Sequence, residues 1–244
     1  MHIGLFIPCY IDQFYPAVGV STLSLLERLG CKVTFPLEQT CCGQPMANSG
    51  CEQDALPVYR HFAKTFAAFD YVVTPSGSCA YHVRKHFDIA EQTPAVAKVR
   101  QTTLELSEFL LDVLDIRDFS GNYFPYRVGI HQSCHGLRGL RLGQASELQG
   151  KQRNNIRELL QTVGGIDLVP LNRQDECCGF GGTFSVTEAS VSVKMGKDRI
   201  RDHVANGAEV MTAGDMSCLM HLEGIIRRQR LPIRVMHYVQ ILNP

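Results

Sequence analysis

The chain repeats one arrangement of cysteines, in the same order, in its two halves. An adjacent pair followed by glycine occurs in "QTCCGQPMA" at residues 39–47 and again in "DECCGFGGTF" at residues 175–184. A cysteine after an apolar run precedes each pair, and a Ser-Cys step follows it. A unit of about half the chain therefore occurs twice, too long and too rarely for a solenoid. We expect two similar domains, residues 1–120 and 121–244, related by a pseudo-two-fold axis.

Each half alternates apolar, β-branched runs with helical patterns. The runs predict strands at 3–7, 32–36 and 71–75 in the first half, and near 127–131, 166–171, 209–213 and 233–237 in the second. The longest helical pattern covers about 187–205. Alternating strands and helices favour an α/β fold, in which each domain is a mainly parallel sheet flanked by helices.

The cysteines follow the predicted strands of each half. Ligands of such sheets bind outside the carboxyl ends of the strands, so thiols placed there should converge. The first set is Cys9, Cys41, Cys42 and Cys79, and the second is Cys134, Cys177, Cys178 and Cys218.

Four converging thiolates suit either zinc or an iron–sulfur cluster. Adjacent cysteines are awkward for one tetrahedral ion, because both thiolates must turn toward the same point, whereas a cluster lets neighbours reach different irons. Gly43 and the run 179–182 also let backbone approach an inorganic core and donate amides to sulfur. The pattern favours a cluster, with zinc and bare redox thiols as alternatives.

Composition narrows the function classes. Lysine plus arginine equals aspartate plus glutamate at 24 each, and no basic stripe stands out, so we expect no nucleic-acid partner. No apolar run approaches the length of a membrane span, and the N-terminus does not read as a signal peptide. We therefore expect a cytoplasmic protein, where clustered cysteines indicate metal or redox chemistry rather than structural disulfides.

The duplicated order Cys, Cys-Cys-Gly, Ser-Cys resembles the CCG cysteine-rich domain family. That family includes the cysteine-rich subunit of heterodisulfide reductase and the iron–sulfur subunits of glycolate and anaerobic glycerol-3-phosphate dehydrogenases. The segments "GCKVTFPLEQTCCGQPMANSG", "TPSGSC" and "DECCGFGGTFSV" most resemble its stand-alone lactate-utilization branch. The resemblance implies an iron–sulfur subunit, with one or two clusters held by the eight cysteines, in an NAD-independent complex that oxidises L-lactate to pyruvate together with other iron–sulfur and accessory subunits.

The sequence departs from the heterodisulfide reductase branch at one position in each half. That branch ends each motif in C-x-x-C, whereas His82 and His221 stand here. Four cysteines suffice for a cubane 4Fe–4S cluster, which we expect, and the histidines are candidates for extra ligands or a proton relay. A thiol-disulfide reductase and a structural zinc protein are the alternatives.

Two further histidines lie close to Cys134. His135 is a candidate to line a lactate or partner pocket, and it joins His82 and His221 as a candidate for an extra ligand or a proton relay. His131, three residues before the cysteine, is more simply interpreted as a satisfied core or rim histidine.

Overall fold

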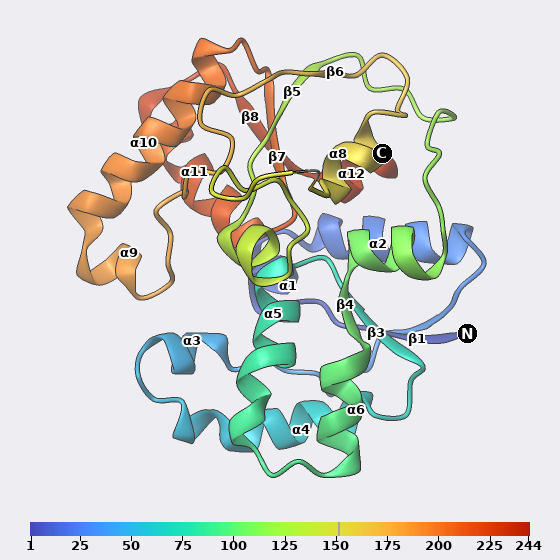
Figure 1. The fold of residues 1–244 in the computed structure, drawn as a ribbon. Coiled ribbons are helices and arrows are strands. Elements are labelled where there is room, and N and C mark those ends of the chain that lie inside the picture. Colours follow the sequence, from blue (N-terminus) through green and yellow to red (C-terminus); the bar gives the residue numbers. More distant parts are fainter. Residues whose placement is uncertain (151) are drawn as a thin grey trace.

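The structure is a computed structural model that describes residues 1–150 and 152–244, and it contains two four-stranded parallel sheets (Figure 1). The first sheet has the order β2-β1-β3-β4 and the second has the order β6-β5-β7-β8. The strands are β1 (His2–Leu5), β2 (Lys32–Thr34), β3 (Tyr71–Thr74), β4 (Thr103–Glu105), β5 (Arg127–Ile130), β6 (Asp167–Leu168), β7 (Val210–Ala213) and β8 (Arg234–His237). The same order in both halves confirms the predicted α/β fold of two similar domains.

Helices connect the strands and cover the sheets. In the first domain they are α1 (Cys9–Phe14), α2 (Pro16–Arg28), α3 (Gln44–Asn48), α4 (Leu56–Phe66), α5 (Gly77–His86), α6 (Pro94–Thr102) and α7 (Leu106–Glu108), which continues as η3 (Phe109–Val113). Two short helical turns, η1 (Gln53–Ala55) and η2 (Phe87–Ile89), complete this domain. In the second domain they are η4 (His135–Gly139), α8 (Asn155–Leu160), α9 (Phe184–Thr187), α10 (Ala189–Ala205), α11 (Met216–Gln229) and α12 (Tyr238–Leu242).

Proline opens several of these helices. It occupies one of the first two positions of α2, α3, α4 and α6, where its missing N–H leaves no intrahelical hydrogen bond unmade.

The two faces of the first sheet pack into separate hydrophobic clusters. Successive side chains of a strand point to opposite faces. Ile3 and Leu5 therefore join one buried cluster, while Phe6 joins another with residues of α4, α5 and α6. The cluster that holds Ile3 and Leu5 continues into the second domain without interruption.

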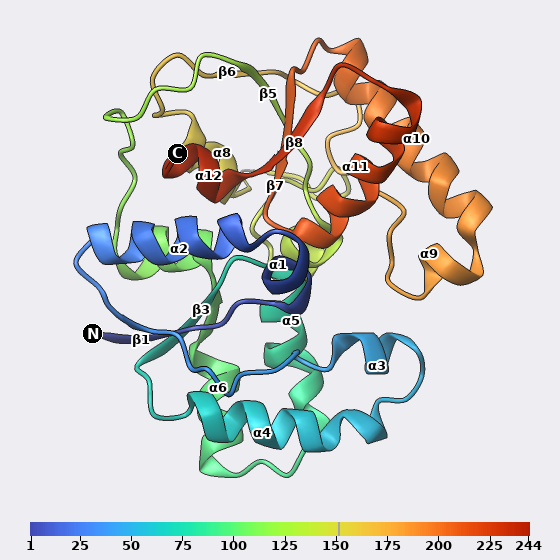
Figure 2. The same ribbon diagram turned by 180° about the vertical axis from the view of Figure 1, so that it is seen from behind.

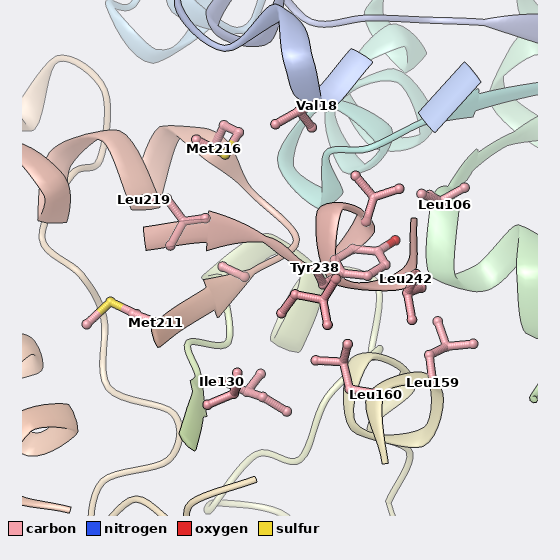
Figure 3. Close-up of a cluster of buried hydrophobic side chains, with 14 of the residues drawn as sticks. Val18, Leu106, Ile130, Leu159, Leu160, Met211, Met216, Leu219, Tyr238 and Leu242 are labelled. Atoms are coloured by element: carbon pink, nitrogen blue, oxygen red, sulfur yellow. The ribbon is translucent and has the colours of Figure 1, made fainter. Parts of the chain in front are cut away.

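That shared core joins the domains. Figure 3 shows Val18 and Leu106 of the first domain close to Tyr238 and Leu242 of the second. All four are almost fully shielded from solvent. A hydrophobic interface of this kind holds two domains in one fixed arrangement.

The interface contacts are reciprocal. Helix α2 packs on α12 between the two sheets (Figure 2). Its repeat equivalent α8 packs on α7, which is the equivalent of α12. In the same way α5 contacts η4 while α1 contacts α11. Because each contact is matched by its exchanged counterpart, the domains are related by the expected pseudo-two-fold axis.

Some elements differ from the sequence-based expectations. Strand β4 was not among the predicted strands, because its three residues precede a helical pattern and include the polar Thr103 and Glu105. Strand β6 has only two residues where six were expected at 166–171. The long helix α10 matches the prediction to within two residues at its start.

None of the helices in the described residues is both long and apolar enough to cross a membrane.

Candidate metal centre

The eight repeated cysteines lie where the strands of each domain end. Cys9 begins α1 four residues after β1, and Cys134 immediately precedes η4 after β5. Cys79 and Cys218 each occupy the third position of a helix, α5 and α11 respectively. In α5 the N-cap Ser76 accepts a hydrogen bond from the Cys79 amide through its hydroxyl, which fixes the helix start and the direction of the thiol.

Within each set the thiols contact one another in sequence order. The Sγ atoms of Cys9 and Cys41 lie 3.7 Å apart. Cys41 interacts in turn with Cys42, and Cys42 with Cys79. The second set forms the same chain of contacts from Cys134 through Cys177 and Cys178 to Cys218.

These contacts lower the pKa of one central thiol of each set. Hydrogen bonds from Cys42 and Cys9 hold the pKa of Cys41 well below its usual range. Hydrogen bonds from Cys134 and Cys178 do the same for the pKa of Cys177. A thiol that ionises readily, flanked by further thiols, belongs to the soft donor set that zinc or an iron–sulfur cluster selects.

The glycine after each cysteine pair is required by the backbone. Gly43 has φ 89° and Gly179 has φ 88°, in the left-handed region that only glycine adopts freely. A Cβ on Gly179 would lie 2.6 Å from the carbonyl oxygen of Ser192. The tight turn also lets amides reach sulfur: Gly179 N–H donates to Cys177 Sγ at 3.3 Å, and Phe180 N–H donates to Cys178 Sγ at 3.4 Å.

Both sets face one cavity between the domains. All eight cysteines line this cavity of about 650 Å³, together with Tyr10, His135, Phe180 and Asp215. The structure thus brings two four-thiol sites to one space. Their thiols, amide donors and glycine turns fit cysteine-based metal binding.

The three predicted histidines differ in their position. His135 lines the cavity and stacks on Tyr81, with ring centroids 5.0 Å apart. His82 is buried outside the cavity lining, and its Nε2 bonds the Tyr59 hydroxyl at 3.0 Å. Burial lowers the pKa of His82 to about 3, so it is neutral at ordinary pH. His221 is half-buried, and its Nε2 donates to the Ser192 carbonyl at 3.3 Å.

Asp215 was not singled out from the sequence, yet it joins the two domains at the cavity wall. Its carboxylate accepts hydrogen bonds from the Ser76 hydroxyl at 2.7 Å and the Ser78 amide at 3.0 Å, both across the interface, and from Ser133 in its own domain. A difference between the repeats could have indicated Asp215 from the sequence, because "TAGDMSC" has an aspartate where "TPSGSC" has Ser76.

A family comparison matches both halves. The family model for the CCG cysteine-rich domain matches residues 3–84 and 128–223. The chain belongs to the CCG cysteine-rich domain family. The matched ranges cover most of each sheet and all eight repeated cysteines, so this member is a tandem duplication of the CCG domain.

Individual relatives of this CCG protein extend over nearly its full length. Lactate utilization protein A of an Exiguobacterium species is 41% identical over 99% of this chain and 97% of the relative. The proteins of that name from Geobacillus thermodenitrificans and Halalkalibacterium halodurans are 42% and 39% identical, over 100% of this chain and 99% and 97% of the relatives. Among solved structures, glutamate racemase isoform RacE1 from Bacillus anthracis matches with a TM-score of 0.37 and 9% identity, covering 99% of this chain and 78% of that chain. A similarity that low supports no argument.

Proposed function

We propose that this CCG protein is an iron–sulfur subunit of a complex that oxidises L-lactate to pyruvate. The observation that carries the proposal is the convergence of two equivalent four-thiol sets on one interdomain cavity. The full-length similarity to proteins named lactate utilization protein A supports lactate as the substrate of the complex. The complex would act in the cytoplasm, where thiols stay reduced and free to bind metal.

The cysteines of each domain would hold one 4Fe–4S cluster, giving two per chain. The adjacent pair favours a cluster over zinc, since Cys41 and Cys42 leave the same loop and one small ion would have to draw both thiolates to one point. A bound cluster supplies one-electron transfer. Amide N–H groups of Gly179 and Phe180 stabilise the anionic sulfurs of the second site.

The lining of the cavity supports oxidation of lactate in a partner subunit. Among the described residues that line it, none is lysine or arginine. A guanidinium is the usual partner of a carboxylate, so the cavity lacks the group that would hold the substrate anion. In this proposal lactate gives up two electrons and two protons in a partner subunit, and the electrons leave one at a time through this chain to an acceptor.

Anaerobic iron, acid-labile sulfide and zinc analysis tests the metal assignment. We expect iron and sulfide in the reconstituted protein, and loss of both from a variant with Cys41, Cys42, Cys177 and Cys178 replaced by serine. Cys51→Ser is the matched control, because this exposed cysteine lies outside both sets and should leave the iron content unchanged. Stoichiometric zinc without sulfide in wild type would refute the cluster.

Lactate-dependent reduction of an artificial acceptor tests the substrate. We expect it only when this chain is combined with its partner subunits. The shared cavity also favours a second candidate, a thiol-disulfide reductase in which a disulfide enters between the two sites. Reduction of a disulfide by the isolated iron-loaded chain, with no response to lactate in the full complex, would decide for that second function.

A further inference from the structure

A buried polar cluster lies behind the second cysteine set, where the first has an aromatic residue. The amide of Phe6 donates to Val73 O at 2.9 Å, and the amide of His131 donates to Thr212 O at 2.7 Å. Because Val73 and Thr212 hold the same place in β3 and β7, Phe6 and His131 are equivalent positions of the two repeats.

The surroundings of these two residues differ in kind. Phe6 packs edge-on against Phe62 of α4, with ring centroids 5.0 Å apart. His131 instead meets Arg199 of α10, whose side chain is fully buried and pairs with Asp202 at 3.2 Å. The second domain therefore keeps a cation and a histidine where the first has hydrocarbon.

The hydrogen bond between Arg199 and His131 determines the tautomer of the imidazole ring. Arg199 Nε–H donates to His131 Nδ1 at 3.2 Å. A guanidinium nitrogen can only donate, so Nδ1 must accept and carries no proton. The proton of the neutral ring is therefore on Nε2.

The imidazole ring of His131 lies next to the second cysteine set. A ring nitrogen of His131 and the Sγ atoms of Cys178 and Cys218 all lie within 4.8 Å of one another. Nδ1 is taken by Arg199, and within the described chain Nε2 is buried with no hydrogen-bond partner. His131 is thus not the satisfied core histidine that the sequence suggested.

We propose that His131 Nε2–H donates a hydrogen bond to sulfur at the second site, and that Arg199 locks it in the donating tautomer. Metal ligation by His131 would need a lone pair on Nε2. The proton would then be on Nδ1, where it would face the Arg199 N–H, and two donors cannot form a hydrogen bond with each other. The Arg199 contact therefore disfavours ligation by His131. The inference rests on the proposed cysteine-ligated clusters and adds a difference between them.

The difference sets a direction for electrons. Hydrogen bonds to sulfur stabilise the more negative, reduced state and raise the reduction potential of a cluster. The second site has His131 and Arg199 behind it, whereas the first has Phe6. The second site therefore has the higher potential and receives electrons from the first.

A redox titration of iron-loaded variants tests this ranking. His131→Phe reproduces the residue of the first repeat and removes the donor. We expect it to lower the higher of the two midpoint potentials, with at least a tenfold change in the equilibrium constant for reduction, about 59 mV for one electron. The lower potential should not move. His131→Gln retains an N–H donor and should shift the potential less. Phe6→Leu, at the equivalent buried position, should leave the higher potential in place.

Long-range proton–nitrogen NMR of the metal-free, reduced wild type reads the tautomer directly and needs no variant to fold. We expect protonated Nε2 and unprotonated Nδ1 in His131. A proton on Nδ1 would overturn the inference, as would equal shifts of both potentials or no shift in iron-loaded His131→Phe. Wild-type protein without iron would instead overturn the proposed function, and with it the redox ranking.

Discussion

Glu105→Gln should remove a pH dependence of folding that originates at the domain interface. Glu105 is fully buried, caps α7 through the Ser107 amide at 2.7 Å and accepts from the Tyr238 hydroxyl of the other domain at 2.7 Å. Burial raises the pKa of this carboxyl to about 8, against the opposing effect of those hydrogen bonds. The folded protein therefore keeps a proton at neutral pH that the unfolded chain loses.

The sign and size of the effect follow from that difference. Because the folded-state pKa is raised, the contribution of Glu105 to stability is complete below its ordinary pKa of 4.5 and is lost as the pH rises to about 8. Between these limits folding retains one proton, so the free energy of unfolding should fall by about 1.4 kcal/mol per pH unit. Over the whole window the loss reaches about 5 kcal/mol.

Urea unfolding of wild type and Glu105→Gln between about pH 5 and about pH 8 measures the effect. The buried histidines and the cysteines titrate in both proteins, so the difference between the two isolates Glu105. Glu27→Gln, at an exposed position of α2, is the matched control and should follow wild type. A difference in unfolding free energy that stays constant across this range would refute the reasoning.

Three further substitutions probe the cysteine sites and the interface. Cys178→Ser should abolish lactate-dependent acceptor reduction by the complex, while Cys42→Ser leaves a measurable fraction, because amides of Gly179 and Phe180 support the second site. Iron content is measured on each variant. Equal losses of activity in the two variants would contradict the greater importance of the second site. Asp215→Ala leaves the buried Ser76 and Ser133 hydroxyls and the partly buried Ser78 amide without their shared acceptor. It should lower the free energy of unfolding by about 3 kcal/mol, read from denaturant titration. Gly179→Ala should lower the free energy of unfolding and the iron content more than Gly50→Ala does in the same assays. Both glycines have positive φ, but only a Cβ at position 179 would meet backbone, at 2.6 Å.

Local patterns predicted much of the fold but little of the geometry at the sites. Apolar runs identified seven of the eight strands. The signal is clearest in β1, β3, β5 and β7, because buried parallel strands are continuous hydrophobic segments. The apolar runs missed β4, whose polar Glu105 faces the interface rather than solvent. They also could not show that His82 bonds Tyr59 at 3.0 Å, outside the cavity, while His135 lines it. The two positions differ in which neighbours pack around them, and that information is not local.

The sequence by itself determined that this protein is a duplicated α/β chain with two matched sets of four cysteines. Both conclusions depend on patterns along the chain. The strand and helix patterns are local, and the matched order of the cysteines is visible when one half of the sequence is compared with the other. Only the tertiary structure decided that the two sets share one cavity, that Asp215 joins domains across 139 residues of chain, and that Arg199 meets His131 from 68 residues away. Such contacts depend on how two sheets and their helices pack against each other. The packing energy that selects one arrangement comes from the buried surface as a whole, not from any single segment.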